Sequence, residues 1–206
     1  MIQAKHTRFH SWFFKWYSHL MIKRHFREMS IHGKVEGKGK AVMVIGNHFS
    51  WWDGFVMLEI NRQLWKKKFH VMMLEEQLQN RMFLNKIGAF SIKKGHRSVV
   101  ASLNYTSKLL EDPQNLVLMF PQGQIQSHHK CSFTFEKGLE TILNKSESKP
   151  QVIFSAVLAD YFSEKKPRLD VYLESVPIDG KTTTHELESK YNDFFQRKIE
   201  ENDWER

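Results

Sequence analysis

The sequence has a single cysteine, Cys131, among its 206 residues. One cysteine cannot form a disulfide within the chain, so we expect the fold to depend on its hydrophobic core and to suit a reducing compartment. No apolar run approaches the ~18 residues of a membrane-spanning helix. Charged residues such as Lys5, Arg8 and Lys15 interrupt the N-terminal segment that a secretory signal peptide needs to be apolar. These absences predict a cytoplasmic protein.

Internal repeats and low-complexity linkers are absent as well. A chain of this length, with 41% hydrophobic and 26% charged residues, is typical of one globular domain with a real core. Short apolar, β-branched runs alternate with segments of helical periodicity, which predicts an α/β domain over residues 31–206 with a mixed, mainly parallel sheet flanked by helices. We expect strands at 41–45, 69–73, 115–120, 152–159 and 169–176, and helices at 50–60, 75–85, 96–112, 135–143 and from 183 onward.

The balance of charge is basic. The formal net charge of +8 indicates an anionic partner, which includes nucleic acid, an anionic membrane surface, acyl carrier protein and CoA esters. No motif of a nucleic-acid-binding family accompanies the charge, so we expect no nucleic-acid partner.

Residues 1–30 form a predicted amphipathic helix that associates with a membrane. Phe9, Phe13, Trp16 and Leu20 recur at helical spacing and share one face, with basic residues between them. Aromatic rings beside cations suit the headgroup region of a bilayer. The alternative is that this face packs against the domain, and both interpretations stay open at this point.

The run from His128 to Cys131 contains three potential metal ligands. Its spacing fits no common zinc pattern and no second ligand pair follows, so we predict no metal site.

The stretch GNHFSWWDG, residues 46–54, follows the apolar run 41–45. It places His48 and Asp53 where a strand gives way to a helix, with Ser50 as the expected N-cap, and open α/β sheets keep their sites at such junctions. A histidine is a general base near neutral pH, and an aspartate bonded to one ring nitrogen would fix its tautomer.

Four short motifs occur in an order that resembles the lysophosphatidic acid (glycerolipid) acyltransferase family. The stretch 47–53 resembles that family's NHxxxxD box, and 88–94 resembles its G-x-[IF]-F-I-x-R motif. The sequence FPQG at 120–123 resembles FPEG, and FEKG at 135–138 resembles the F-x-x-G that follows it.

The resemblance implies transfer of a fatty acyl group from acyl-CoA or acyl carrier protein to a hydroxyl of a lysophospholipid or related lipid, with no further cofactor. His48 would be the general base and Asp53 would orient it, and no covalent intermediate is needed. The Gly123 N–H would hold the oxyanion. The expected substrate-binding residues are Asn47, Ser50, Lys94, Phe120, Pro121, Gln122 and Gly123. The alternative is a catalytically silent lipid- or membrane-binding module with the same fold.

The sequence departs from the family pattern where the acceptor is expected to bind. Lys94 stands where the family has an arginine, Gln122 where it has a glutamate, and Gln124-Ile125 where it has Thr-Arg. Lysine keeps a positive charge but lacks the bidentate fork of arginine. We therefore expect a membrane amphiphile with a free hydroxyl as acceptor, either a phosphate ester or a non-phosphate lipid such as an N-acyl amino acid, and an enzyme peripheral to the inner face of the membrane.

Overall fold

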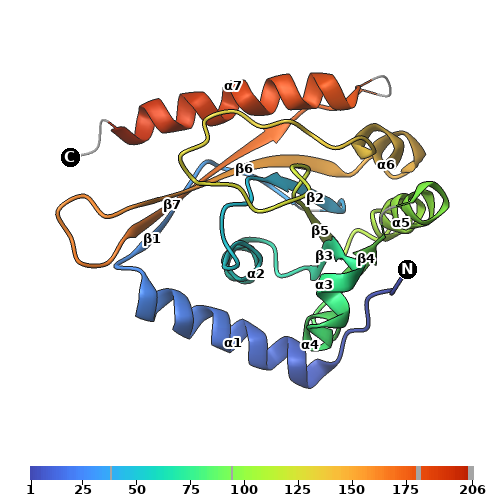
Figure 1. Ribbon diagram of the computed structural model, residues 1–206, viewed down its shortest axis with the longest axis horizontal. Coiled ribbons are helices and arrows are strands. Elements are labelled where there is room, and N and C mark those ends of the chain that lie inside the picture. The colour runs from blue at the N-terminus through green and yellow to red at the C-terminus, as the bar shows by residue number, and fades with distance from the viewer. Residues whose placement is uncertain (38, 94, 180–181, 204–206) are drawn as a thin grey trace.

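In the computed structural model, a seven-stranded sheet forms the centre of a single α/β domain (Figure 1). The structure describes residues 1–37, 39–93, 95–179 and 182–203. The strand order is β1-β7-β6-β2-β5-β3-β4. The β6–β7 pair is antiparallel and the other neighbouring pairs are parallel, which confirms the predicted mixed, mainly parallel sheet. The strands are β1 Met29–His32, β2 Val42–Gly46, β3 Lys68–Leu74, β4 Ala89–Ile92, β5 Asn115–Met119, β6 Gln151–Asp160 and β7 Arg168–Val176.

Helices cover both faces of the sheet. Helices α5, α6 and α7 contribute to the core on one face, and α1 and α2 contribute to the core on the other. Strand β2 shows the consequence, because Val44 packs with α2 while Ile45 packs with α7, and the whole strand is buried. The helices are α1 Arg8–His25, α2 Asp53–Leu64, α3 Glu75–Gln79, α4 Met82–Asn85, α5 His96–Leu109, α6 Leu139–Lys145 and α7 Thr184–Asp203.

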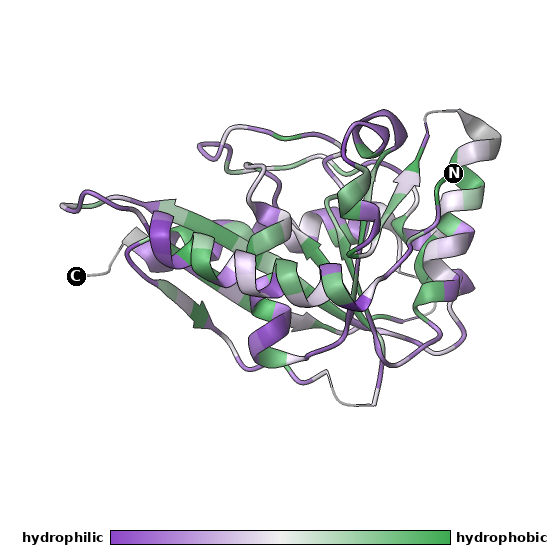
Figure 2. Ribbon diagram, turned by 90° about the horizontal axis from the view of Figure 1, so that it is seen from below, coloured by the Kyte–Doolittle hydropathy of each residue, from purple (hydrophilic) through white to green (hydrophobic). Residues whose placement is uncertain are grey.

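Helix α1 lies outside α2 (Figure 1), and hydrophobic and hydrophilic residues are interspersed along it (Figure 2). Its apolar side chains lie on two different faces. Phe14 and Ile22 belong to the packed face, since they contact the core beneath α1. The face predicted from helical spacing is turned to the outside instead. The exposed fractions are 66% for Phe9, 66% for Trp12, 54% for Trp16 and 42% for Leu20. The expected helix is therefore present, and three of the four residues of its predicted face are exposed, while Phe13 is half-buried against Phe14 and Tyr17.

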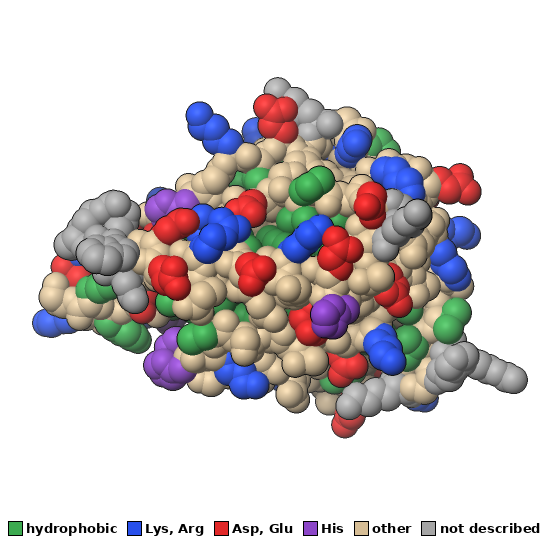
Figure 3. All heavy atoms as spheres, turned by 90° about the horizontal axis from the view of Figure 1, so that it is seen from above, with side chains coloured by type: hydrophobic (Ala, Val, Ile, Leu, Met, Phe, Trp, Pro, Cys, Tyr) green, Lys and Arg blue, Asp and Glu red, His purple; other side chains and the backbone are tan. Residues whose placement is uncertain are grey.

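The face of the molecule over α7 is different. Figure 3 shows acidic and basic side chains intermixed there. Several of them pair, for example Lys190 with Glu186 and Lys198 with Glu201. None of the helices in the described part of the chain is long and apolar enough to cross a membrane.

Three helix predictions need correction. The helix predicted to begin at residue 135 is α6, which begins at Leu139. Helix α2 begins at Asp53 rather than at Ser50, because the Asp53 carboxylate accepts hydrogen bonds from the Phe49 and Ser50 amides and holds those residues in a loop. The predicted helix 75–85 is broken into α3 and α4, and the second of these exposes Met82 and Phe83.

Candidate active site

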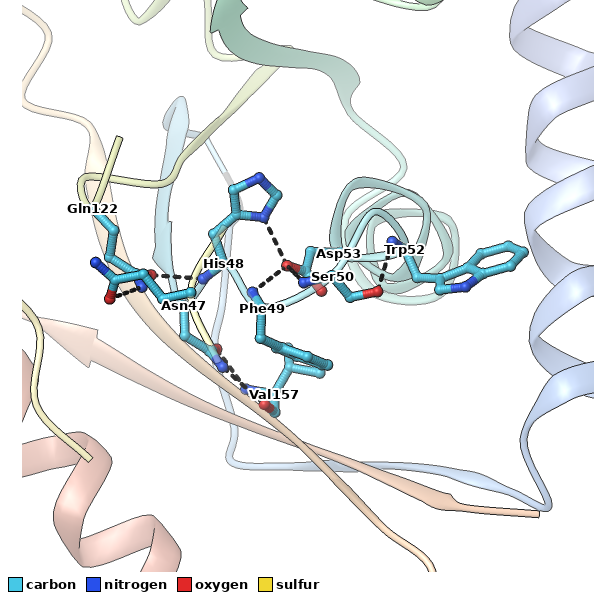
Figure 4. A network of polar contacts seen from close by, with 9 residues as sticks. Asn47, His48, Phe49, Ser50, Trp52, Asp53, Gln122 and Val157 are labelled. Carbon is cyan, nitrogen blue, oxygen red and sulfur yellow. Dashed lines mark hydrogen bonds and ion pairs between the residues drawn. The ribbon is translucent and has the colours of Figure 1, made fainter. Parts of the chain in front are cut away.

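The loop between β2 and α2 brings His48 and Asp53 into direct contact (Figure 4). The distance between His48 Nδ1 and Asp53 Oδ2 is 2.7 Å. The same carboxylate oxygen accepts the Phe49 amide at 2.8 Å and the Ser50 amide at 2.9 Å. Because this oxygen is an acceptor for all three groups, we assign the ring proton to Nδ1. The unprotonated Nε2 points away from Asp53 and can take a proton.

Burial separates the two members of the pair. The Asp53 side chain is 2% exposed and the His48 side chain is 23% exposed. Burial raises the pKa of the Asp53 carboxyl above its usual 3.8, while hydrogen bonds from His48, Ser50 and Phe49 oppose that rise by favouring the ionised form. Asp53 also lies in the first turn of α2, where the helix dipole favours a negative charge. The arrangement thus places a carboxylate behind a partly accessible imidazole.

The loop after β5 holds His48 from the other side. Strands β2 and β5 are parallel neighbours, so the residues that follow them lie side by side. The His48 N–H donates to Gln122 Oε1 at 2.6 Å, and the Gln126 N–H donates to the His48 carbonyl at 2.9 Å. Gln122 Nε2 in turn donates to Gln126 Oε1 at 2.9 Å. The Phe120 ring stacks on the imidazole with its centroid 4.2 Å away. The main chain and the ring of His48 are therefore both fixed.

Asn47 and Ser50 were both predicted to bind substrate. In the structure their side chains form hydrogen bonds within the protein. Asn47 is 3% exposed. Its side chain donates to the Val157 carbonyl at 2.9 Å and accepts the Val157 N–H at 2.9 Å, which ties the end of β2 to β6. The Ser50 hydroxyl accepts the Trp52 N–H at 3.1 Å. Both polar side-chain atoms of Asn47 are thus bonded to Val157, and the residue joins two strands at the site.

The predicted oxyanion donor is also engaged. The Gly123 N–H donates to the Phe120 carbonyl at 3.1 Å and closes a tight turn, so it does not point at the reacting group as expected. Gly123 has φ +69°, a backbone conformation that glycine adopts readily. The conformation of the turn therefore accounts for a glycine at this position. Pro121 is buried, and its carbonyl accepts the Glu136 N–H at 2.7 Å. Lys94 lies outside the described residues.

Two residues of this region were missing from the prediction. Gln126 carries no motif, and only the fold shows that it bonds to both His48 and Gln122. Tyr191 on α7 is buried, and its hydroxyl donates to the Ser155 carbonyl on β6 at 2.9 Å. Within the described ranges, no three His, Cys, Asp or Glu side chains come together as metal ligands would.

Comparisons with known proteins bear on this site. A sequence model of the family described as Acyltransferase matches residues 25–157, a range that contains the loops after β2 and β5. No curated protein matches the chain. Among solved structures, the chain is similar to the 1-acyl-sn-glycerophosphate (LPA) acyltransferase PlsC from Thermotoga maritima, with a TM-score of 0.66 and 15% sequence identity over 91% of this chain and 78% of that chain. At 15% identity this similarity is evidence for the fold alone.

Proposed function

The chain belongs to the acyltransferase family, and from this premise we propose that it transfers a fatty acyl group from a thioester to a hydroxyl of a lysophospholipid or related lipid. The donor would be acyl-CoA or acyl carrier protein, both of which are anionic and suit a chain of net charge +8. The observation that carries the proposal is the 2.7 Å contact between His48 Nδ1 and Asp53 Oδ2.

The reaction needs a base because a neutral hydroxyl is a poor nucleophile. His48 Nε2 takes the hydroxyl proton as the oxygen attacks the thioester carbonyl. The tetrahedral intermediate then collapses, the carbon–sulfur bond breaks, and the thiolate takes the proton from the imidazolium. The acyl group moves directly from sulfur to oxygen, so no covalent enzyme intermediate is required.

Asp53 supports both halves of this cycle. Its carboxylate holds the proton on Nδ1, so that Nε2 is the nitrogen that accepts a proton, and it stabilises the imidazolium that forms. The two amides that bond to the same oxygen keep the carboxylate in place when the charge on the ring changes.

For the acceptor we propose an amphiphile with a free hydroxyl, either a phosphate ester or a non-phosphate lipid such as an N-acyl amino acid. Gln122 supports a departure from the usual substrate, since it stands in place of the family's glutamate and both ends of its carboxamide bond within the protein. Ile125 stands in place of an arginine and is 52% exposed, so a cation that would meet a phosphate is missing there. High activity on lysophosphatidic acid together with none on non-phosphate acceptors would exclude the non-phosphate option.

A lipid acceptor requires access to a membrane. The exposed face of α1 supports peripheral attachment, because Phe9, Trp12 and Trp16 are more than half exposed and basic residues flank them. We propose that this face lies on the inner surface of the membrane and that the enzyme draws its acceptor from there.

The test is an assay of acyl transfer with purified protein and labelled donor. Changing His48 to Ala is expected to reduce the rate by roughly 10²- to 10⁴-fold, the usual contribution of a general base. The matched control is His185→Ala, which removes an exposed histidine on α7 and should retain full activity. Equal rates for wild type and His48→Ala would show that His48 is not the base, and no transfer by the wild type with any hydroxylated lipid would favour the silent binding module.

A further inference from the structure

A basic cavity of about 480 Å³ lies between the first turns of α1 and the turn that joins α2 to β3. It is at the amino end of β3, whereas His48 follows the carboxyl end of β2. Because β2, β5 and β3 run parallel, the cavity and His48 lie at opposite ends of the sheet. Its size is in the range of sites that bind small ligands and headgroups. The lining residues are His6, Thr7, Arg8, Ser11, Trp12, Lys15, Leu58, Lys66, Lys67, Lys68, Phe69 and Ile87.

The cavity has a mostly apolar wall, its lining residues include five lysine or arginine side chains, and none of them is acidic. Arg8, Lys15, Lys66 and Lys68 form no ion pair with any residue of the described ranges. Unpaired cations this close together repel one another unless an anion joins them. Helix α1 adds to the field, since it begins beside the cavity and has no acidic residue in its first turn.

The lysine-rich turn is held by hydrogen bonds from a buried side chain and to the main chain. Lys66 has φ +55°, a conformation that residues with a Cβ rarely adopt, yet the position holds a lysine instead of a glycine. Asn61 is fully buried, and its side chain donates to the Lys67 carbonyl at 2.8 Å and accepts the Lys67 N–H at 3.0 Å. The Lys67 ammonium donates to the carbonyls of Lys40 and Pro113. The buried bonds hold the turn so that Lys66 and Lys68 stay beside α1.

The cavity is continuous with the exposed aromatic face of α1. Trp12 belongs to both, because it lines the cavity and is 66% exposed. At the other end of α1, roughly 27 Å away for 18 residues, the His25 ring lies 5.2 Å from the Trp52 ring in the active-site loop. Anchoring α1 near Arg8 would therefore determine the orientation of the His48 loop relative to the membrane.

We propose that this cavity binds the phosphate group of an anionic membrane lipid and so orients α1 along the membrane surface. The inference rests on the membrane attachment in the proposed function. A lipid phosphate is the occupant because the cations supply the charge and the hydrogen-bond donors that phosphate needs, while Trp12 and Phe9 beside them supply the surface that enters a bilayer.

The experiment measures binding of the full chain to phosphatidylglycerol vesicles and to phosphatidylcholine vesicles, without any acyl donor. The test variant is Lys66→Gly/Lys68→Gln. Glycine at φ +55° relieves backbone strain, so the thermal midpoint should not fall. We expect binding to phosphatidylglycerol to weaken by roughly tenfold or more, since each lysine near an anionic surface contributes to attachment, and binding to phosphatidylcholine to change little.

The matched control is Lys23→Gln/Arg24→Gln, which removes two exposed charges from the same helix outside the cavity. A clearly smaller loss in this control supports a built site. Equal losses in the two variants would overturn the site, because the attraction would then be diffuse. A second result would overturn the lipid assignment in favour of a free anion. In that case inorganic phosphate would raise the thermal midpoint of the wild type, and all variants would bind vesicles equally.

His48→Ala separates this inference from the proposed function. It should transfer acyl groups roughly 10²- to 10⁴-fold more slowly than the wild type and bind phosphatidylglycerol vesicles as the wild type does. If substitution of Lys66 and Lys68 leaves vesicle binding unchanged while acyl transfer still depends on His48, the cavity assignment fails and the proposed function stands.

Discussion

The Phe120 ring lies flat against the His48 imidazole, with 4.2 Å between the ring centroids and 11° between the planes. Phe120 follows β5 and His48 follows β2, two parallel strands at the centre of the sheet. The contact therefore joins the two loops of the site. It makes Phe120 a positioning residue, because it restrains the plane in which Nε2 can take a proton.

Replacing Phe120 with Leu should lower kcat by about 10- to 100-fold, since small misplacements of a reacting group have effects of that size. Phe120→Tyr keeps the stacked ring and should restore most of the rate. The measurement is steady-state kinetics of acyl transfer, with kcat and KM determined separately. A change in KM alone would indicate that Phe120 contacts substrate and does not position His48.

Replacing Gln122 with Glu should destabilise the protein, although it restores the family's usual residue. Gln122 is 6% exposed, and a carboxylate there would lose the bond from Nε2 to Gln126 Oε1 and face that oxygen with no proton between them. The expected loss is about 1–3 kcal/mol in the free energy of unfolding, measured by urea denaturation. Adding Gln126→Lys supplies a donor and should recover part of it. An unchanged unfolding midpoint in Gln122→Glu would show that the Gln122–Gln126 bond contributes nothing.

Replacing Gly123 with Ala should lower stability by about 1–2 kcal/mol, the usual penalty for an L-residue in the left-handed region. The backbone there has φ +69°, and the added Cβ would lie 3.1 Å from Glu136 Cγ. Gly39→Ala is the matched comparison, because Gly39 has φ +74° and an added Cβ would meet nothing within 4 Å. Gly123→Ala should be at least as destabilising as Gly39→Ala in the same denaturation experiment. The reverse order would show that the turn after β5 tolerates a Cβ.

The stability of the protein should decrease in acid through Glu59, a buried carboxylate of α2 that also bonds to His19 of α1. Burial alone would raise the pKa of the Glu59 carboxyl, but hydrogen bonds from Arg62, Gln63 and His19 outweigh it and lower the pKa below the usual 4.5. The folded carboxyl thus binds protons less readily than the unfolded one. Its contribution to stability is complete above pH 4.5 and is lost as the pH falls through the folded pKa.

The measurement is the free energy of unfolding of wild type and Glu59→Gln across this range of pH. The wild type should be more stable above pH 4.5, and the difference should shrink as the pH drops below it. A difference that does not depend on pH would mean that the charge of Glu59 does not contribute to stability.

The sequence alone predicts those features of the structure that depend on residues close together in the chain. The buried run at β2 and the short separation between His48 and Asp53 predict their contact, because a strand and the helix after it fix the loop between them. The alternation of apolar runs and helical segments predicts the sheet and its flanking helices for the same reason.

Features that depend on distant parts of the chain could not be predicted. Gln122 meets His48 only because β5 lies beside β2, and the Gly123 amide bonds to Phe120 through a turn geometry that a motif does not specify. Helix α1 carries apolar side chains on two faces, one with Phe14 and one with Trp16, and periodicity alone cannot say which of them packs.

The most direct test of the central claim is a double-mutant cycle on His48 and Asp53. Asp53→Asn alone should slow acyl transfer by roughly 10²- to 10⁴-fold, because the ring loses the carboxylate that holds its tautomer. If the two residues act as one unit, His48→Ala/Asp53→Asn should be about as slow as His48→Ala alone. Rate losses that multiply in the double variant would contradict the account, since they would show that Asp53 acts without His48.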